Sequence, residues 1–359
     1  MGSGKSKPKA GADQAQADQA QAQAKSAGVP TAQQGVSLAF LTWFATYVEP
    51  GKTTHETVEG VVKAQTEESK CAYVELMEAK DVGPPAFYVI HAWNRPFSKL
   101  VKALTRGLPA AAPDTPPDKL FVWIDVFALN QWTQVEAQPA QRVADAKAAL
   151  TACGAAVLCL DSHAAVLTRS WVLYELYAAV RGAGAGKLTL LSSYVKGSDL
   201  KHRLDRLDMD ASAATLPADK DALAAALEAD GGRPAGAQPL APTLCTALLE
   251  CARAGALTME ATVNAASTAA KDAQAAAEAA AKAAEEGAAG PDAAVLATAS
   301  EDAKKAAAGA KAKHDALVLQ YALSVFRAAC FLQAAGMVEE AHGLYRAALD
   351  INDEELGGA

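Results

Sequence analysis

The sequence predicts an α/β fold, built on a parallel sheet of about five strands with helices on both faces and followed by an all-helical region. Between residues 85 and 230, short apolar runs alternate with segments whose apolar residues recur at helical spacing. After Gly231 the pattern becomes helical and rich in alanine. Alternating strands and helices favour a covered parallel sheet, in which ligands bind at the carboxyl ends of the strands.

Each predicted strand is an apolar run beside a turn or a helix. The first reads AFYVIHAW and follows Pro84-Pro85, and the second reads LFVWIDVF. A proline-rich loop is expected at 109–118, between the first helix and the second strand. The predicted strands are 86–93, 120–127, 155–160, 188–192 and a short fifth at 204–209; the predicted helices are 97–104, 139–151, 167–180 and 219–228.

Changes in composition divide the chain into five expected regions. Residues 1–35 lack large apolar side chains, which predicts a disordered tail. A helical collar is expected at 36–84 and the α/β domain at 85–230. Alanine-rich helices are expected at 235–313, and a helical hairpin at 314–359.

The bulk properties exclude several classes of protein. A formal net charge of -8 argues against a chain-wide nucleic-acid surface, which needs a basic stripe. The six cysteines lack metal-binding spacing, so we expect reduced thiols and no metal site. The sequence contains no run of 18 apolar residues, so no membrane span is predicted. The composition therefore indicates a cytoplasmic protein without a nucleic-acid partner.

The first residues fit the pattern for N-terminal myristoylation. Gly2 is followed by Ser6 and Lys7, and Lys5 and Lys9 add positive charge that favours an anionic membrane surface. One acyl chain gives only marginal membrane binding. We therefore expect peripheral membrane contact through acylated Gly2; the alternative is an unmodified, solvated tail.

Polar and aromatic side chains follow the predicted strands, where a crevice is expected. Glu175 is the one acid in the apolar part of the helix LTRSWVLYELYAAV, so it must find a partner or line a pocket. Stacking rings, donors and acids together suit a small molecule with a base or a sugar. The alternative is that each side chain satisfies local backbone at a strand end. Besides Glu175, the candidate binding residues are His91, Trp93, Arg95, Asp125, Asn130, Trp132 and Ser162.

The helix that contains Glu175 resembles a helix of TIR domains, in which a Ser/Arg-rich turn leads into a Trp-x-Leu-x-Glu-Leu pattern. The order of the surrounding strands and helices is also similar, over roughly residues 85–230. The matching residues are Ser170, Trp171, Leu173, Glu175 and Leu176.

A second stretch resembles the related heterokaryon-incompatibility domain. It runs from Trp123-Ile124-Asp125 to Asn130-Gln131, where that family has a WID…NQ stretch. The chain departs from the TIR pattern at Val172, where the family has cysteine, and it has no clear glycine-rich turn after the second strand. The resemblance implies a TIR/flavodoxin-like sheet.

The resemblance implies two functions. Enzymatic TIR domains cleave the nicotinamide–ribose bond of NAD, and Glu175 matches their catalytic carboxylate; NAD would then be a substrate and not a resident cofactor. A carboxylate stabilises the oxocarbenium-like transition state of such a cleavage. Burial would raise the pKa of Glu175, whereas Arg95 or Arg169 nearby would lower it. Other TIR-like domains only self-associate or bind partners.

The end of the chain resembles a tetratricopeptide helix pair. Gly336, Ala341, Tyr345 and Ala348 occupy the small and aromatic positions of that repeat. One repeat is visible and at least three are normally needed for a solenoid. A hairpin that packs on the alanine-rich helices is therefore favoured over a peptide-binding groove.

These observations support three hypotheses. The first is a TIR-like signalling or scaffold protein that acts through protein–protein interaction or self-association. The second is an NAD glycohydrolase with Glu175 as its catalytic carboxylate. The third is a myristoylated structural adaptor at a membrane or a cilium.

Overall fold

The computed structural model describes most of the chain. The described residues are Pro30 and 34–112, 115–133, 137–191, 195–232 and 240–356. Most of the expected N-terminal tail, including Gly2, lies outside these ranges. The predictions of disorder and acylation therefore stay predictions.

The chain forms two compact units. Unit 1 holds the sheet and comprises Met1–Cys159, Val166–Leu191 and Leu207–Leu240. Unit 2 is helical and comprises Leu160–Ala165, Ser192–Arg206 and Ala241–Ala359.

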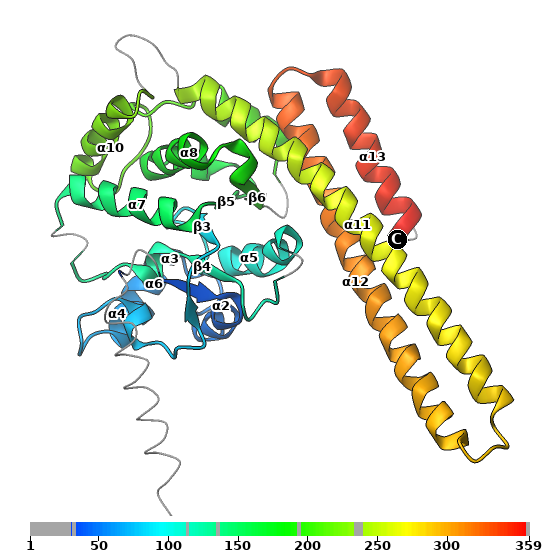
Figure 1. Cartoon of the computed structure of the whole chain (residues 1–359). Helices are drawn as coiled ribbons and strands as arrows, with labels where there is room; N and C mark the ends of the chain where they lie inside the picture. The colour runs from blue at the N-terminus through cyan, green and yellow to red at the C-terminus, as the bar shows by residue number, and fades with distance from the viewer. Residues whose placement is uncertain are drawn as a thin grey trace, which may run out of the picture. The chain divides into compact units, whose positions relative to one another are not determined.

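Unit 1 is built on a mostly parallel sheet (Figure 1). β3 (Phe87–Ile90) pairs in parallel with β4 (Phe121–Trp123) and β5 (Ala156–Cys159), and β5 pairs in parallel with β6 (Leu188–Leu191). The chain passes from β3 to β4 on one side and returns to β5 on the other, so the winding changes direction between β3 and β5. In spatial order the strands are β2 (Val82–Gly83), β1 (Gly35–Ser37), β4 (Phe121–Trp123), β3 (Phe87–Ile90), β5 (Ala156–Cys159) and β6 (Leu188–Leu191).

The α/β class is confirmed, with three differences among the strands. β3, β4, β5 and β6 correspond to four predicted strands, but the second was predicted too long, because its residues from Asp125 onward form the short helix α6 (Asp125–Ala128). The fifth prediction, 204–209, is wrong, because Leu204 is the last residue of helix α9 (Gly197–Leu204) and the five described residues after it form turns and irregular structure. β1 and β2 extend the sheet instead, and both are antiparallel to their neighbours where they pair. Strands of two and three residues are too short to carry an alternating pattern.

Helices cover both faces of the sheet. Figure 1 shows α7 (Pro139–Cys153) and α8 (Ser170–Ala183) on one face, and α2 (Leu38–Phe44) and α5 (Phe97–Ala111) on the other. α10 (Pro217–Ala229) packs on α7 and α8. These elements agree with the predicted helices, although α5 extends through Pro109 into the expected loop. Pro109 has no amide hydrogen to donate within the helix, and α5 ends two residues later, at Ala111.

The segment 36–84 contributes core residues of unit 1. Besides α2 it forms the short helices η2 (Ala45–Tyr47), α3 (Thr54–Thr57), η3 (Val58–Val62), α4 (Lys63–Gln65) and η4 (Tyr73–Leu76). The ring of Phe44 lies 4.8 Å from that of Phe127, in α6 (Asp125–Ala128), and edge to face with it. Such aromatic pairs add to the free energy gained by burial alone.

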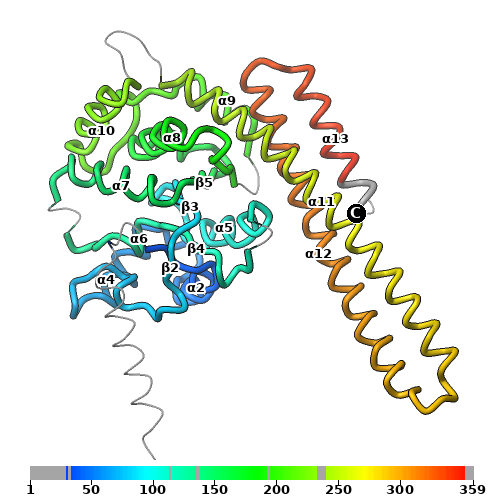
Figure 2. The backbone as a smooth tube through the Cα atoms, viewed as in Figure 1, coloured from blue at the N-terminus to red at the C-terminus, as the bar shows by residue number. Residues whose placement is uncertain are grey.

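Unit 2 is dominated by three long helices (Figures 1 and 2). Figures 1 and 2 show α11 (Leu240–Glu286) and α12 (Ala293–Ala334) as an antiparallel hairpin, and α13 (Val338–Leu356) packs on α12. The boundary expected at 313/314 falls inside α12. The turn between α12 and α13 uses Gly336 at φ +83°, a backbone conformation that favours glycine.

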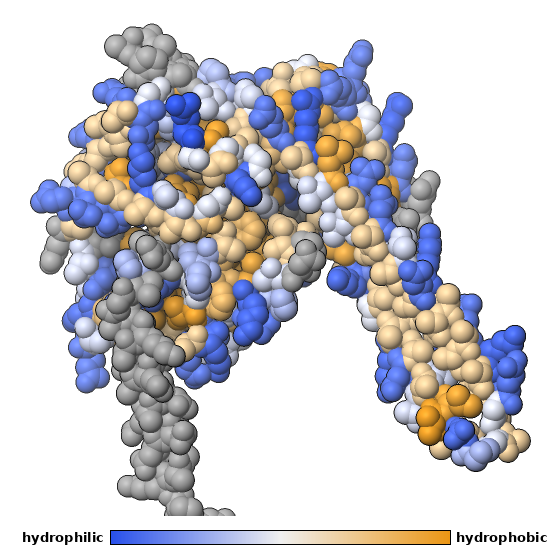
Figure 3. Space-filling model, viewed as in Figure 1, coloured by the Kyte–Doolittle hydropathy of each residue, from blue (hydrophilic) through white to orange (hydrophobic). Residues whose placement is uncertain are grey.

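The hairpin is rich in small side chains. Figure 3 shows the pale orange of alanine interrupted by blue charged residues along it. Among described residues, α11 and α12 are long and apolar enough to cross a membrane by length and composition. Core helices of globular proteins pass the same test.

Candidate functional site

Glu175 lies on α8 and faces the sheet. Strand alternation directs Tyr88 to the face that α8 covers, where the phenol is 1% exposed and stacks on Trp123 with ring centroids 4.5 Å apart. The Tyr88 hydroxyl donates a 2.7 Å hydrogen bond to Oε1 of Glu175. The sequence pattern alone did not single out Tyr88, because an aromatic residue inside an apolar strand looks like core.

The environment of Glu175 favours the neutral carboxylic acid. Burial raises its pKa from 4.5 to about 8; the Tyr88 hydrogen bond lowers the pKa, and the charge of Asp125 raises it further. Arg95 and Arg169 are not among these influences. Burial, with the charge of Glu175 and their hydrogen bond, also raises the pKa of Tyr88 well above its ordinary value.

Asp125 organises the neighbouring strand ends. It follows β4 and begins α6, and its Oδ1 accepts the Val126 amide at 2.8 Å. The indole nitrogen of Trp93 donates to Oδ2 at 2.7 Å. Nε2 of His91 lies 2.9 Å from Oδ1, and an ionised carboxylate only accepts, so the imidazole donates through Nε2. Asp125 keeps 27% of its side chain exposed, whereas His91 keeps 5%.

Two hydrogen-bonded groups therefore lie along β3 and β4: Tyr88 with Glu175, and His91 and Trp93 with Asp125, whose charge acts on Glu175. We call Tyr88, His91, Trp93, Asp125 and Glu175 the strand-end cluster. Nδ1 of His91 is buried and has no hydrogen-bond partner within the described part of the chain. Buried polar atoms are normally paired, so the unpartnered Nδ1 is a feature that a bound water or ligand would satisfy.

Two other predicted site residues, Asn130 and Trp132, contact the segment 36–84 instead. The Asn130 side-chain amide donates to the Lys70 carbonyl at 2.6 Å, and the Trp132 indole donates to Oγ1 of Thr66 at 3.0 Å. Nζ of Lys70 lies 3.2 Å from the centre of a Trp132 ring. These contacts favour the structural alternative for Asn130 and Trp132.

Arg95 and Ser162 are also seen in backbone contacts. The Arg95 carbonyl accepts the amide of Thr54 at 2.9 Å. Ser162 belongs to unit 2, where its carbonyl accepts the amide of Lys196 at 2.9 Å. No group of three or more His, Cys, Asp or Glu residues that could hold a metal ion occurs among the described residues.

The start of α8 is fixed by a network separate from Glu175. Oγ of Ser170 lies 2.7 Å from Oγ of Ser212. The Trp171 indole donates to Oδ2 of Asp219 at 3.0 Å, and Asp219 pairs with Arg142 through its other oxygen. Ser170 and Trp171 therefore anchor the start of α8, and neither of them contacts Glu175 through these hydrogen bonds.

The fold and site together define a mixed α/β protein with a polar cluster at the carboxyl edge of its sheet. No family model matches the chain, and comparisons with curated proteins and with solved structures find no similar protein.

Proposed function

We propose that unit 1 is a TIR-like, flavodoxin-like module that cleaves the nicotinamide–ribose bond of NAD. The observation that carries the proposal is Glu175, hydrogen-bonded to Tyr88 beside Asp125, with a pKa raised to about 8 at the carboxyl edge of the sheet. The strand order β4-β3-β5-β6, with its change of winding direction beside the cluster, supports the fold assignment.

The chemistry needs little more than one carboxylate. The C1′–N bond of the ribose breaks, its electron pair leaves with neutral nicotinamide, and water adds to C1′ and loses a proton. Positive charge moves onto the ribose in the transition state, and ionised Glu175 stabilises it. The indole of Trp93 offers a stacking surface, and the unpartnered Nδ1 of His91 offers a hydrogen-bonding atom.

The raised pKa gives this proposal a distinctive pH dependence. At pH 7 only about a tenth of free Glu175 is ionised, because its pKa is about 8. The cationic nicotinamide ring lowers that pKa on binding, since a nearby positive charge favours the carboxylate. kcat/KM is therefore expected to rise about tenfold per pH unit below pH 8, whereas kcat levels off at lower pH.

The test measures nicotinamide release from NAD between pH 5.5 and 9. Glu175→Gln keeps an acceptor for Tyr88 but removes the charge, and it should abolish release. Tyr88→Phe removes the bond that lowers the pKa, so the rise in kcat/KM should move to higher pH. Glu250→Gln, on the exposed side of α11, is the matched control. No release from the wild-type chain at high protein concentration, or unchanged release by Glu175→Gln, would refute the proposal.

We propose self-association as a second candidate function, because unit 1 exposes an aromatic pair. Trp43 and Tyr47 are 51% and 55% exposed, with ring centroids 4.8 Å apart. Exposed aromatic residues are enriched at protein interfaces. Sedimentation should show oligomers that dissociate in Trp43→Ser with Tyr47→Ser; a wild-type monomer at high concentration would exclude this function.

We infer from the sequence pattern that Gly2 is acylated, which would give the chain a peripheral membrane contact. Gly2→Ala should move the protein from the membrane fraction to the soluble fraction of a cell extract. An unchanged distribution would contradict the inference.

A further inference from the structure

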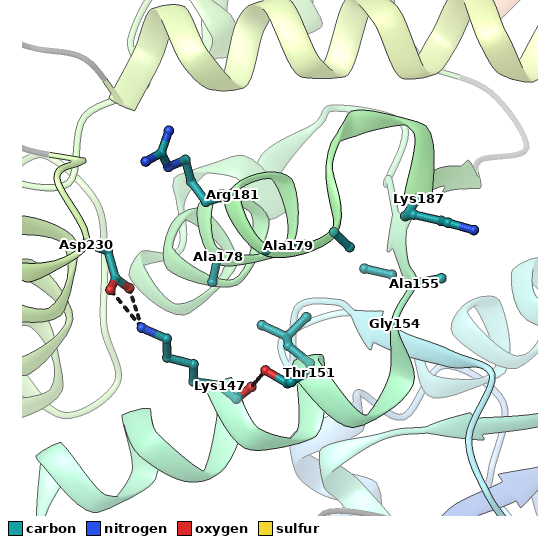
Figure 4. Close-up of a pocket in the computed structure, with 13 residues that line it drawn as sticks. Lys147, Thr151, Gly154, Ala155, Ala178, Ala179, Arg181, Lys187 and Asp230 are labelled. Atoms are coloured by element: carbon teal, nitrogen blue, oxygen red, sulfur yellow. Dashed lines mark hydrogen bonds and ion pairs between the residues drawn. The ribbon is translucent and has the colours of Figure 1, made fainter.

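A cavity lies at the amino-terminal edge of the sheet, opposite the strand-end cluster. It has a volume of about 580 Å³ and opens beside the start of β5, between the C-terminal halves of α7 and α8 (Figure 4). Its walls include Gly154, Ala155, Ala178, Ala179 and Gly182. Small side chains leave the space between the helices unfilled, and the volume falls within the range of small-molecule sites.

Charged side chains surround this apolar floor. Figure 4 shows Lys147 joined to Asp230 at one end, Arg181 on α8 above Ala178, and Lys187 at the other end. Nζ of Lys147 lies 2.7 and 2.9 Å from the two Asp230 oxygens. Arg181 and Lys187 are exposed, and neither forms an ion pair within the part of the chain that the structure describes.

The local charge favours one negative charge in the cavity. The charged side chains that line the cavity are Lys147, Arg181, Lys187 and Asp230, and together they carry a net charge of +2. α7 and α8 both end at the cavity, and the C-terminus of each helix contributes roughly half a negative charge. The sum is about +1, in a chain whose net charge is -8.

We propose that this cavity binds an organic carboxylate. The apolar body of the ligand lies on the alanine and glycine floor, and its carboxylate pairs with Arg181, whose planar guanidinium suits bidentate contact. Lys147 is the weaker partner, because Asp230 competes for it. The site uses none of the strand-end cluster, so it does not depend on NAD cleavage.

A simpler role for these cations is to complement the two helix C-termini. Arg181 lies in the last turn of α8, where a cation stabilises the helix by a few tenths of a kcal/mol to about 1 kcal/mol. That role needs no cavity and predicts no ligand. The two roles therefore differ in whether a carboxylate binds and in how binding responds to cavity shape.

The test uses the full chain and measures binding by calorimetry. The two probes, 2-naphthoate and the uncharged 2-naphthalenemethanol, have a similar shape and differ in charge. The naphthoate should bind at least tenfold more tightly than the alcohol. Arg181→Glu should weaken naphthoate binding at least tenfold, and Asp230→Asn should strengthen it several-fold by releasing Lys147.

A charge-neutral variant tests the shape of the site. A Cβ at Gly182 would meet no atom within 4 Å, so Gly182→Leu should fold normally, fill space beside Ala178 and abolish binding. Lys102→Glu, an exposed charge reversal on α5, is the matched control and should bind as the wild type does. Circular dichroism checks that each variant is folded. Absent naphthoate binding, equal affinity for the alcohol, or wild-type binding in Gly182→Leu would overturn the proposal.

Discussion

Replacing Glu175 by glutamine should change how the stability of unit 1 depends on pH. The wild-type carboxyl has a folded pKa of about 8, above its ordinary 4.5, because burial disfavours the charge. As pH rises, the unfolded state therefore loses this proton first. The neutral acid therefore adds to the free energy of unfolding; this contribution is fully present below pH 4.5 and is lost as pH rises to about 8.

The size of the effect follows from the two pKa values. Between pH 5 and pH 7, wild-type stability should fall by up to about 2.5 kcal/mol through this one group. A glutamine side chain does not titrate, so the Glu175→Gln variant should lack this loss. Its amide oxygen can still accept the hydroxyl of Tyr88, which keeps the local hydrogen bond.

Urea unfolding followed by tryptophan fluorescence measures this difference. All five tryptophans lie in unit 1, so the signal reports on that unit alone. Other titrating groups contribute equally to both proteins, and their effects cancel when the variant is compared with the wild type. Parallel pH profiles for the two proteins would refute the assignment of a raised pKa to Glu175.

Three further substitutions have definite expected effects on stability. Asp219→Ala removes the carboxylate that pairs with buried Arg142, and urea unfolding should show a loss of about 3 to 5 kcal/mol. Ser37→Ala removes the N-cap that accepts the Phe40 amide at 3.0 Å, and the same assay should show a loss of about 1 kcal/mol. Gly336→Ala places a side chain at φ +83°, so circular dichroism should show lower thermal stability of unit 2, by about 1 kcal/mol, while tryptophan fluorescence stays unchanged.

The central sheet was predictable because its strands are buried on both faces. Runs such as AFYVIHAW and AAVLCL stand out against their flanking turns, and they became β3 and β5. β1 and β2 were not predictable, because they depend on pairing with distant partners and not on a local pattern. Leu204 and Leu207 misled the prediction, since two apolar residues three apart fit a helix end as well as a strand.

The candidate site was predictable where topology alone brings residues together. His91, Trp93 and Asp125 follow adjacent parallel strands, so the crevice rule places them side by side. Asn130 and Trp132 lie in the following loop, and their positions depend on Lys70 and Thr66, more than 55 residues away. No local pattern encodes such a contact.

The α11–α12 hairpin should be unequally stable along its length. In α12, Phe331, Leu332 and most of the other buried side chains lie at or beyond Val318, whereas between Ala293 and Val318 only Ser300 and Ala307 are buried. Local opening costs less where few apolar side chains are buried. Amide hydrogen exchange should therefore show a graded loss of protection toward the Gly287–Asp292 turn, so that this hairpin opens from its tip as a zipper does, while its base unfolds with α13.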